Sequence, residues 1–103
     1  MKALLINPAT KTIERVEVDN QQDIAKHIGY ETLESDEVGP EGDRMFFDEE
    51  CFIRGDASAG RFQIDNIVPV AGKAVVIGAS QDGSILNNVS GDIDALAERI
   101  KYI

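Results

Sequence analysis

The sequence has no tryptophan, one cysteine (Cys51) and one histidine (His27). A single cysteine excludes an internal disulfide and is typical of a reducing compartment, so we expect a cytoplasmic protein. A structural zinc site needs four ligands, more than one Cys and one His supply. No apolar run approaches the ~18 residues of a membrane span. We therefore expect a single domain over residues 1–103 with no cofactor and no bound metal.

Positive charge is also scarce. The chain has 10 Lys and Arg residues against 19 Asp and Glu residues, which gives a net charge of −9. Binding to nucleic acid phosphates or to an anionic membrane surface needs clustered cations, so this balance argues against both partners. The partners that the charge permits are basic proteins and cations, and the same charge also serves solubility.

One segment has the pattern of a central strand. Lys73–Ala79 contains four consecutive apolar residues, Ala74 to Ile77, and lies directly after Gly72. An apolar, β-branched run without alternation is typical of a strand that is covered on both faces. We expect the other strands to pair beside this one.

Two β-hairpins are predicted before it. The first joins a buried strand at Ala3–Ile6 to an alternating strand at Thr12–Val18. A bulge or a strand start is expected near Glu14 because Ile13 is out of phase with Val16 and Val18. The second joins Tyr30–Val38 to Arg44–Phe47.

Turns and loops have their usual residues in three places. Gly39–Asp43 contains the Pro and Gly of a tight turn, and Gly55–Gly60 is small and polar, as in an exposed loop. After the central strand, Gln81-Asp82-Gly83 predicts a hairpin turn into a return strand that starts at Ser84–Leu86.

Two helices are predicted. The first covers Gln21–Ile28 after the capping residues 19–20 and ends at Gly29. The second covers Asp92–Tyr102, with Ser90 as its N-cap. The fold class that follows is α+β, with a mostly antiparallel sheet built from hairpins and two helices packed on one face.

Acidic residues concentrate between Glu31 and Glu50, where nine carboxylates accompany one cation, Arg44. Such a hairpin is either a surface that binds a basic protein, for example as a DNA mimic, or a solvated part of an acidic protein. A divalent-cation site is a weaker alternative because the spacing of a calcium loop is missing. The candidate partner-binding residues are Glu34, Asp36, Glu37, Glu41, Asp43, Asp48, Glu49 and Glu50.

Two further function classes remain open. Cys51, with His27, or the carboxylates Asp48–Glu50 could serve a small enzyme or an accessory subunit. The carboxylates before Cys51 oppose thiolate formation, so we expect this residue to act as a small buried apolar side chain. A structural homodimer could also form through an edge strand such as Ala3–Ile6 or Cys51–Ile53.

Several short segments together carry a family pattern: Met1–Pro8, Ile13–Val18, His27–Glu31, Phe47–Glu50 with Arg54-Gly55, Gly72–Gly78, and the last helix after Ser90. These segments resemble the DUF3846 family of small bacterial and phage proteins. The resemblance spans most of the chain and implies a single small domain in a phage or mobile-element setting, without catalytic residues to transfer. We therefore expect a non-enzymatic interaction protein, monomer or homodimer, whose acidic hairpin binds a basic host or phage protein.

Overall fold

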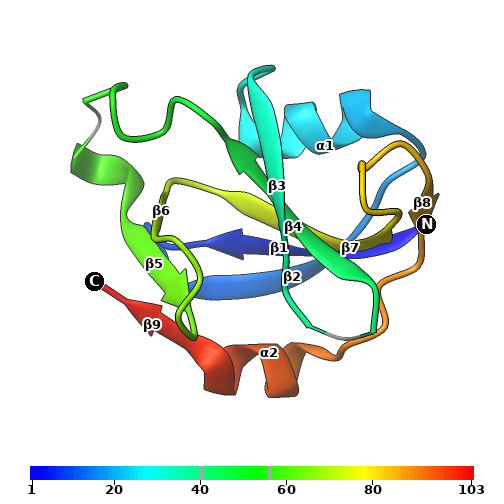
Figure 1. Cartoon of the computed structure of the whole chain (residues 1–103). Helices are drawn as coiled ribbons and strands as arrows, with labels where there is room; N and C mark the ends of the chain where they lie inside the picture. The colour runs from blue at the N-terminus through cyan, green and yellow to red at the C-terminus, as the bar shows by residue number, and fades with distance from the viewer. Residues whose placement is uncertain (40, 56) are drawn as a thin grey trace.

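Two antiparallel sheets and two helices form the fold (Figure 1). The computed structural model describes residues 1–39, 41–55 and 57–103. The main sheet has the strand order β2-β1-β7-β4-β3, with β8 paired to the end of β7, and the small sheet has the order β6-β5-β9. The strands are β1 (Lys2–Asn7), β2 (Thr12–Glu17), β3 (Leu33–Glu37), β4 (Asp43–Asp48), β5 (Arg61–Ile64), β6 (Val70–Ala71), β7 (Ala74–Ala79), β8 (Leu86–Asn87) and β9 (Ile100–Tyr102).

The predicted central strand is confirmed. β7 lies in the middle of the main sheet, where it pairs antiparallel with β1 on one side and β4 on the other. Ala74, Val75 and Ile77 are fully buried. Both faces of β7 are covered because its side chains divide between two cores: Ala74 and Val76 belong to one, Val75 and Ile77 to the other.

The α+β class and the mostly antiparallel sheet are confirmed, but the placement of both helices on one face is wrong. Helix α1 (Gln21–Ile28) packs Ile24 and Ile28 against the face that carries Val75. Helix α2 (Ile93–Arg99) packs Leu96 into the core on the opposite face (Figure 1). Since strand residues alternate between the two faces, both faces of this sheet are apolar and each needs its own cover.

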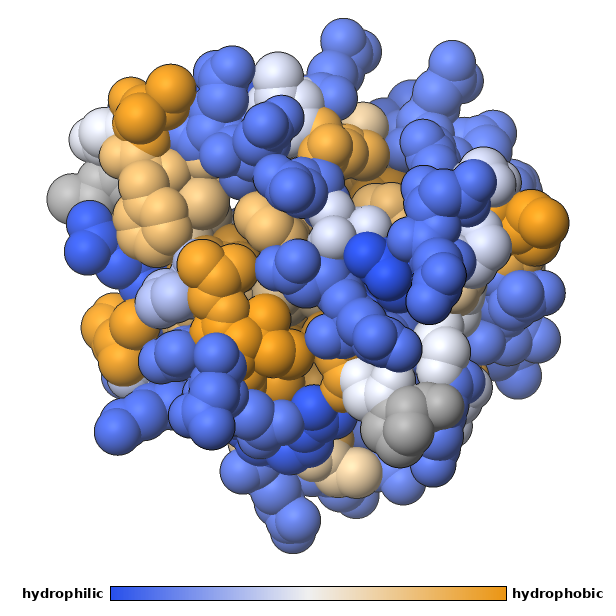
Figure 2. Space-filling model, viewed as in Figure 1, coloured by the Kyte–Doolittle hydropathy of each residue, from blue (hydrophilic) through white to orange (hydrophobic). Residues whose placement is uncertain are grey.

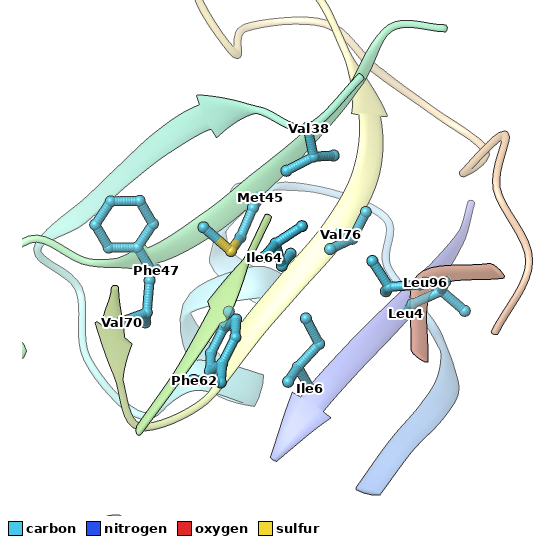
Figure 3. Close-up of a cluster of buried hydrophobic side chains, with 11 residues drawn as sticks. Leu4, Ile6, Val38, Met45, Phe47, Phe62, Ile64, Val70, Val76 and Leu96 are labelled. Carbon is cyan, nitrogen blue, oxygen red and sulfur yellow. The ribbon is translucent and has the colours of Figure 1, made fainter. Parts of the chain in front are cut away.

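The small sheet shares the second face with α2. Phe62 and Ile64 of β5 and Val70 of β6 are fully buried and meet Met45 and Val76 of the main sheet (Figure 3). This core is therefore a sheet-on-sheet contact closed at one end by a short helix.

The first hairpin has no bulge. β1 and β2 pair without interruption from Lys2 opposite Glu17 to Asn7 opposite Thr12. The prediction of a bulge or a strand start near Glu14 was wrong, since β2 begins at Thr12 and both of its faces meet apolar groups. Ile13 packs against the core of the small sheet, while Val16 packs against that of α1.

Helix α1 has its predicted bounds. The Asn20 side chain accepts a hydrogen bond from the Asp23 amide, and Gly29 ends the helix with φ of 94°. Helix α2 is shorter than predicted, since the chain turns into β9 at Ile100. Its N-cap is Asp92, whose carboxylate accepts from the Ala95 amide, and not Ser90.

Neither segment that was predicted as a dimer edge lies at an edge. Ala3–Ile6 belongs to β1, which pairs with a strand on each side. Cys51–Ile53 forms a turn after β4. β2 and β3 are the outer strands of the main sheet.

Two predictions lie partly outside the described residues, the turn 39–43 through Pro40 and the loop 55–60 through Asp56. In the described part of that loop, Ala57–Ala59 form a short 3-10 helix, η1. The second hairpin is confirmed as the β3–β4 pair. None of the helices in the described part of the chain has the length and apolar character needed to cross a membrane.

Candidate functional site

The acidic hairpin consists of β3 and β4 and carries its carboxylates on both faces of the sheet. Glu34 and Asp36 lie opposite Phe47 and Met45, which belong to the core under the small sheet. Residues directly opposite each other in an antiparallel pair share a face, so these two carboxylates point to that side. Glu37 lies opposite Arg44, on the face that α1 covers.

Asp43 and Asp48 are buried and act within the fold. Asp43 is 8% exposed and its two carboxylate oxygens accept from the amides of Ser90 and Gly91, at 2.9 and 3.0 Å. These bonds connect the start of β4 to the segment that leads into α2. Neither carboxylate is available as a surface charge.

Asp48 is 2% exposed and accepts hydrogen bonds from the Thr32 hydroxyl, the Glu50 amide and Arg54, whose Nε lies 2.9 Å from Oδ2. Burial by itself raises the pKa of Asp48, but the bonds from Arg54, Thr32 and the Glu50 amide outweigh it and hold this pKa below the ordinary carboxyl value. The Arg54 guanidinium also stacks 4.0 Å from the Tyr30 ring centre. Sequence reasoning missed this role of Arg54, because nothing local to the sequence shows that Asp48 is buried.

The other six candidates lie at the surface, but not in one patch. Glu34, Glu37, Glu41, Glu49 and Glu50 are exposed, and Asp36 is half-buried. Glu41 lies at the turn of the hairpin, while Glu49 and Glu50 lie beyond its other end, about 20 Å from the start of β4 at ~3.3 Å per residue. The three carboxylates of β3 extend along the strand: Glu37 lies towards the turn, whereas Glu34 lies opposite Phe47, two residues from Glu49.

Glu37 lies opposite Arg44, but none of the three carboxylates on β3 forms an ion pair in the described part of the chain. Arg44, the one cation inside the acidic segment, instead donates to the side-chain and backbone oxygens of Ser35, both at 3.0 Å. Glu50 differs, since it lies 3.8 Å from Arg54.

β3 is an outer strand with one open side. The Glu49 amide donates to the Thr32 carbonyl and the Val38 amide donates to the Asp43 carbonyl. Backbone groups alternate along an antiparallel strand, so those of Glu34 and Asp36 face β4 while those of Ser35 and Glu37 face the outer side. Of these outward groups, the Ser35 carbonyl already accepts a hydrogen bond from Arg44. We define the acidic edge as β3 with the side chains of Glu34, Asp36 and Glu37.

The large exposed apolar side chains lie outside the acidic edge. Phe52, Ile53 and Val68 are each about half or more exposed. Figure 2 shows apolar surface at the left, on the side of β5 and β6, while most of the face in view is hydrophilic. The acidic edge is therefore distinct from the main apolar surface in that view.

Cys51 is half-buried, and its sulfur lies 3.5 Å from the Ala71 amide, which donates to it. It packs against the core of the small sheet, as expected of a small apolar side chain, but also lines a surface cleft beside Arg54. His27 lies on α1 and is not among the residues lining that cleft. The described residues include no group of three His, Cys, Asp or Glu side chains placed to hold a metal ion.

Comparison of the chain with models of protein families, with curated proteins and with solved structures finds no match. The resemblance to the DUF3846 family, and the mobile-element setting that it implies, stay predictions. The functional argument therefore rests on the geometry of the chain alone.

Proposed function

We propose that this protein is a non-enzymatic interaction module, whose acidic edge binds an extended basic segment of a partner protein in the cytoplasm. The observation that carries the proposal is that Glu34, Asp36 and Glu37 form no ion pair with a described residue and lie along the outer strand of the main sheet. A partner strand would pair with the outward amides of Ser35 and Glu37 and would displace Arg44 from the Ser35 carbonyl. Lys or Arg side chains on the two faces of that strand would meet the carboxylates.

The geometry favours an extended segment over a DNA-like surface. A duplex mimic presents many charges on one surface, whereas two of the eight candidates are buried here and the remaining six are distributed over both faces and both ends of the hairpin. Strand addition uses both faces of β3 at once, because alternate side chains of the added strand point to opposite sides.

The test compares three proteins in affinity capture from lysate: the parent, an edge variant and a charge-matched control. The edge variant carries Glu34→Gln, Asp36→Asn and Glu37→Gln. The control carries Glu14→Gln, Asp19→Asn and Glu98→Gln, three exposed carboxylates with no side-chain partner among the described residues. Both lose three negative charges, so a general charge effect would weaken them equally.

We expect the parent and the control to capture the same basic protein, the edge variant to lose it, and ~0.5 M salt to release it because screening shortens electrostatic reach. The captured protein is then purified and its binding is measured by calorimetry. Equal affinity of the parent and the edge variant, or equal loss in both variants, would overturn the proposal.

A further inference from the structure

A cleft of about 280 Å³ lies at one end of the main sheet. The end of β1, the start of β7 and the end of β4 meet there because the three strands are neighbours and antiparallel. Asn7, Asp48 and Lys73 come from these strand ends, and Tyr30 and Cys51 come from the segments that follow α1 and β4. Five separate parts of the chain thus contribute to one concave surface.

The lining of the cleft carries one cation without a carboxylate partner in the described part of the chain, which has a net charge of −9 over its whole length. Its charged side chains are Asp48, Arg54 and Lys73. Arg54 is held by Asp48 and the Tyr30 ring and lies 3.8 Å from Glu50. Lys73 is exposed and makes no hydrogen bond or ion pair with any described residue. Its charge is therefore available to a ligand.

The remaining wall is mostly small and apolar. Ile28, Ala59 and Ala71 contribute to it, together with the ring of Tyr30 and the thiol of Cys51. The volume is near the lower end of the range for ligand pockets, about 300–1,000 Å³. A site of this size and composition fits a flat apolar body that bears one charged group.

We propose that this cleft binds a small organic anion, with its apolar body against Tyr30 and the small side chains and its carboxylate or phosphate at Lys73 and Arg54. Lys73 supplies a charge that no described protein group neutralises, and Arg54 is fixed in place before the ligand arrives. This site shares no residue with the acidic edge, so the two proposals can fail independently.

The single thiol gives a direct readout, since Cys51 lines the cleft and the chain has no other cysteine. The experiment measures the rate of alkylation by iodoacetamide in the presence of benzoate or phenyl phosphate. Benzyl alcohol serves as the neutral probe of similar shape, and inorganic phosphate serves as the head group alone. Amide chemical shifts of the ¹⁵N-labelled protein provide a second readout that does not modify the thiol.

We expect benzoate or phenyl phosphate to slow alkylation of Cys51 saturably and to shift the amides around Lys73, at probe concentrations up to about 10 mM. Benzyl alcohol and inorganic phosphate should have little effect. Lys73→Gln should weaken binding about 5–10-fold by removing one charge-assisted contact. The matched control, Lys101→Gln, lies on β9 outside the cleft and should bind as the parent does.

Three results would overturn the proposal: neither anion protects Cys51 or shifts these amides, benzyl alcohol acts as strongly as benzoate, or Lys73→Gln binds with the affinity of the parent. Because Lys73 is exposed and makes no bond within the described chain, its replacement should leave the fold intact. The amide spectrum of the variant verifies this in the same experiment.

Discussion

Carboxylates that are close in sequence have different roles in this protein, and burial separates them. Asp43 and Asp48 stand at the two ends of β4, and each is satisfied by groups that come from other segments. Glu49, next to Asp48, is exposed. A buried carboxylate is stable in its charged form only when it accepts several hydrogen bonds, so Asp43 and Asp48 stabilise the fold and do not act as surface charges.

The pH dependence of the stability lost in Asp48→Asn tests whether the charged Asp48 carboxylate stabilises the fold. The pKa of Asp48 is lowered in the folded state, so its contribution to stability is complete above the ordinary carboxyl pKa of about 4 and is lost as pH falls through the lower, folded-state pKa. Asp48→Asn should cost about 1–3 kcal/mol at pH 7 and less at pH 2. Urea unfolding followed by circular dichroism at both pH values measures the difference. Glu49→Gln is the control and should remain within about 0.5 kcal/mol of the parent at pH 7.

Gly60 is required by close packing as well as by its backbone angle. A Cβ at this position would lie 2.7 Å from the Pro8 carbonyl carbon, and φ is +76°. Gly29 has φ of +94° but nothing within 4 Å of such an atom. We expect Gly29→Ala to cost about 1–2 kcal/mol from backbone strain alone. Gly60→Ala should cost about 3 kcal/mol or more from strain plus overpacking. Equal losses in thermal or urea unfolding would contradict this packing.

At the scale of elements, prediction succeeded where the signals were local. Helix α1 has a capping Asn20, an apolar Ile24 and Ile28 at helical spacing, and Gly29 at its end, so its bounds follow from a few neighbouring residues. The second helix was predicted too long because Ile93, Leu96 and Ile100 continue the helical spacing into β9. Pairing of β9 with β5, far away in the sequence, makes the end of the chain a strand.

Both candidate sites depend on contacts between distant parts of the chain, which the sequence does not show. The composition of the acidic segment was visible, but not the division between buried and exposed carboxylates, because Ser90 and Gly91 lie more than forty residues from Asp43. The cleft gave no sequence signal, since its residues extend from Asn7 to Lys73.

Lys101→Pro tests whether residues 100–102 form a strand. The Asp65 amide donates to the Arg99 carbonyl, and the Ile103 amide donates to the Arg61 carbonyl. Because hydrogen-bonded pairs alternate along an antiparallel ladder, Lys101 and Gln63, which lie opposite each other between these two bonds, also form a hydrogen-bonded pair. Proline removes that donor and should cost about 1–3 kcal/mol in urea unfolding. Lys101→Ala keeps the donor and should remain within about 0.5 kcal/mol of the parent. A proline variant as stable as the alanine variant would contradict the β5–β9 pairing.

At the scale of the whole molecule, the acidic edge and the cleft with Lys73 are two separate candidate sites. The acidic edge is the outer strand on one side of the main sheet, and the cleft with Lys73 and Arg54 lies at an end of the same sheet. Acidic side chains on an outer strand also discourage pairing between copies of the chain. The edge could therefore serve only to keep the protein monomeric, and a decisive measurement must separate that role from binding.

The most direct measurement is a titration of the ¹⁵N-labelled protein with a synthetic peptide of repeated Lys-Lys-Val-Val, which places Lys on both faces of an extended strand. Amide chemical shifts and analytical ultracentrifugation follow the binding. Binding to the acidic edge predicts saturable shifts at Leu33–Glu37, lost at ~0.5 M salt, weakened about 10-fold or more in the edge variant and unchanged in the charge-matched control. No shift at β3 in the parent, together with dimerisation of the edge variant, would contradict the account and show that these carboxylates only prevent self-association.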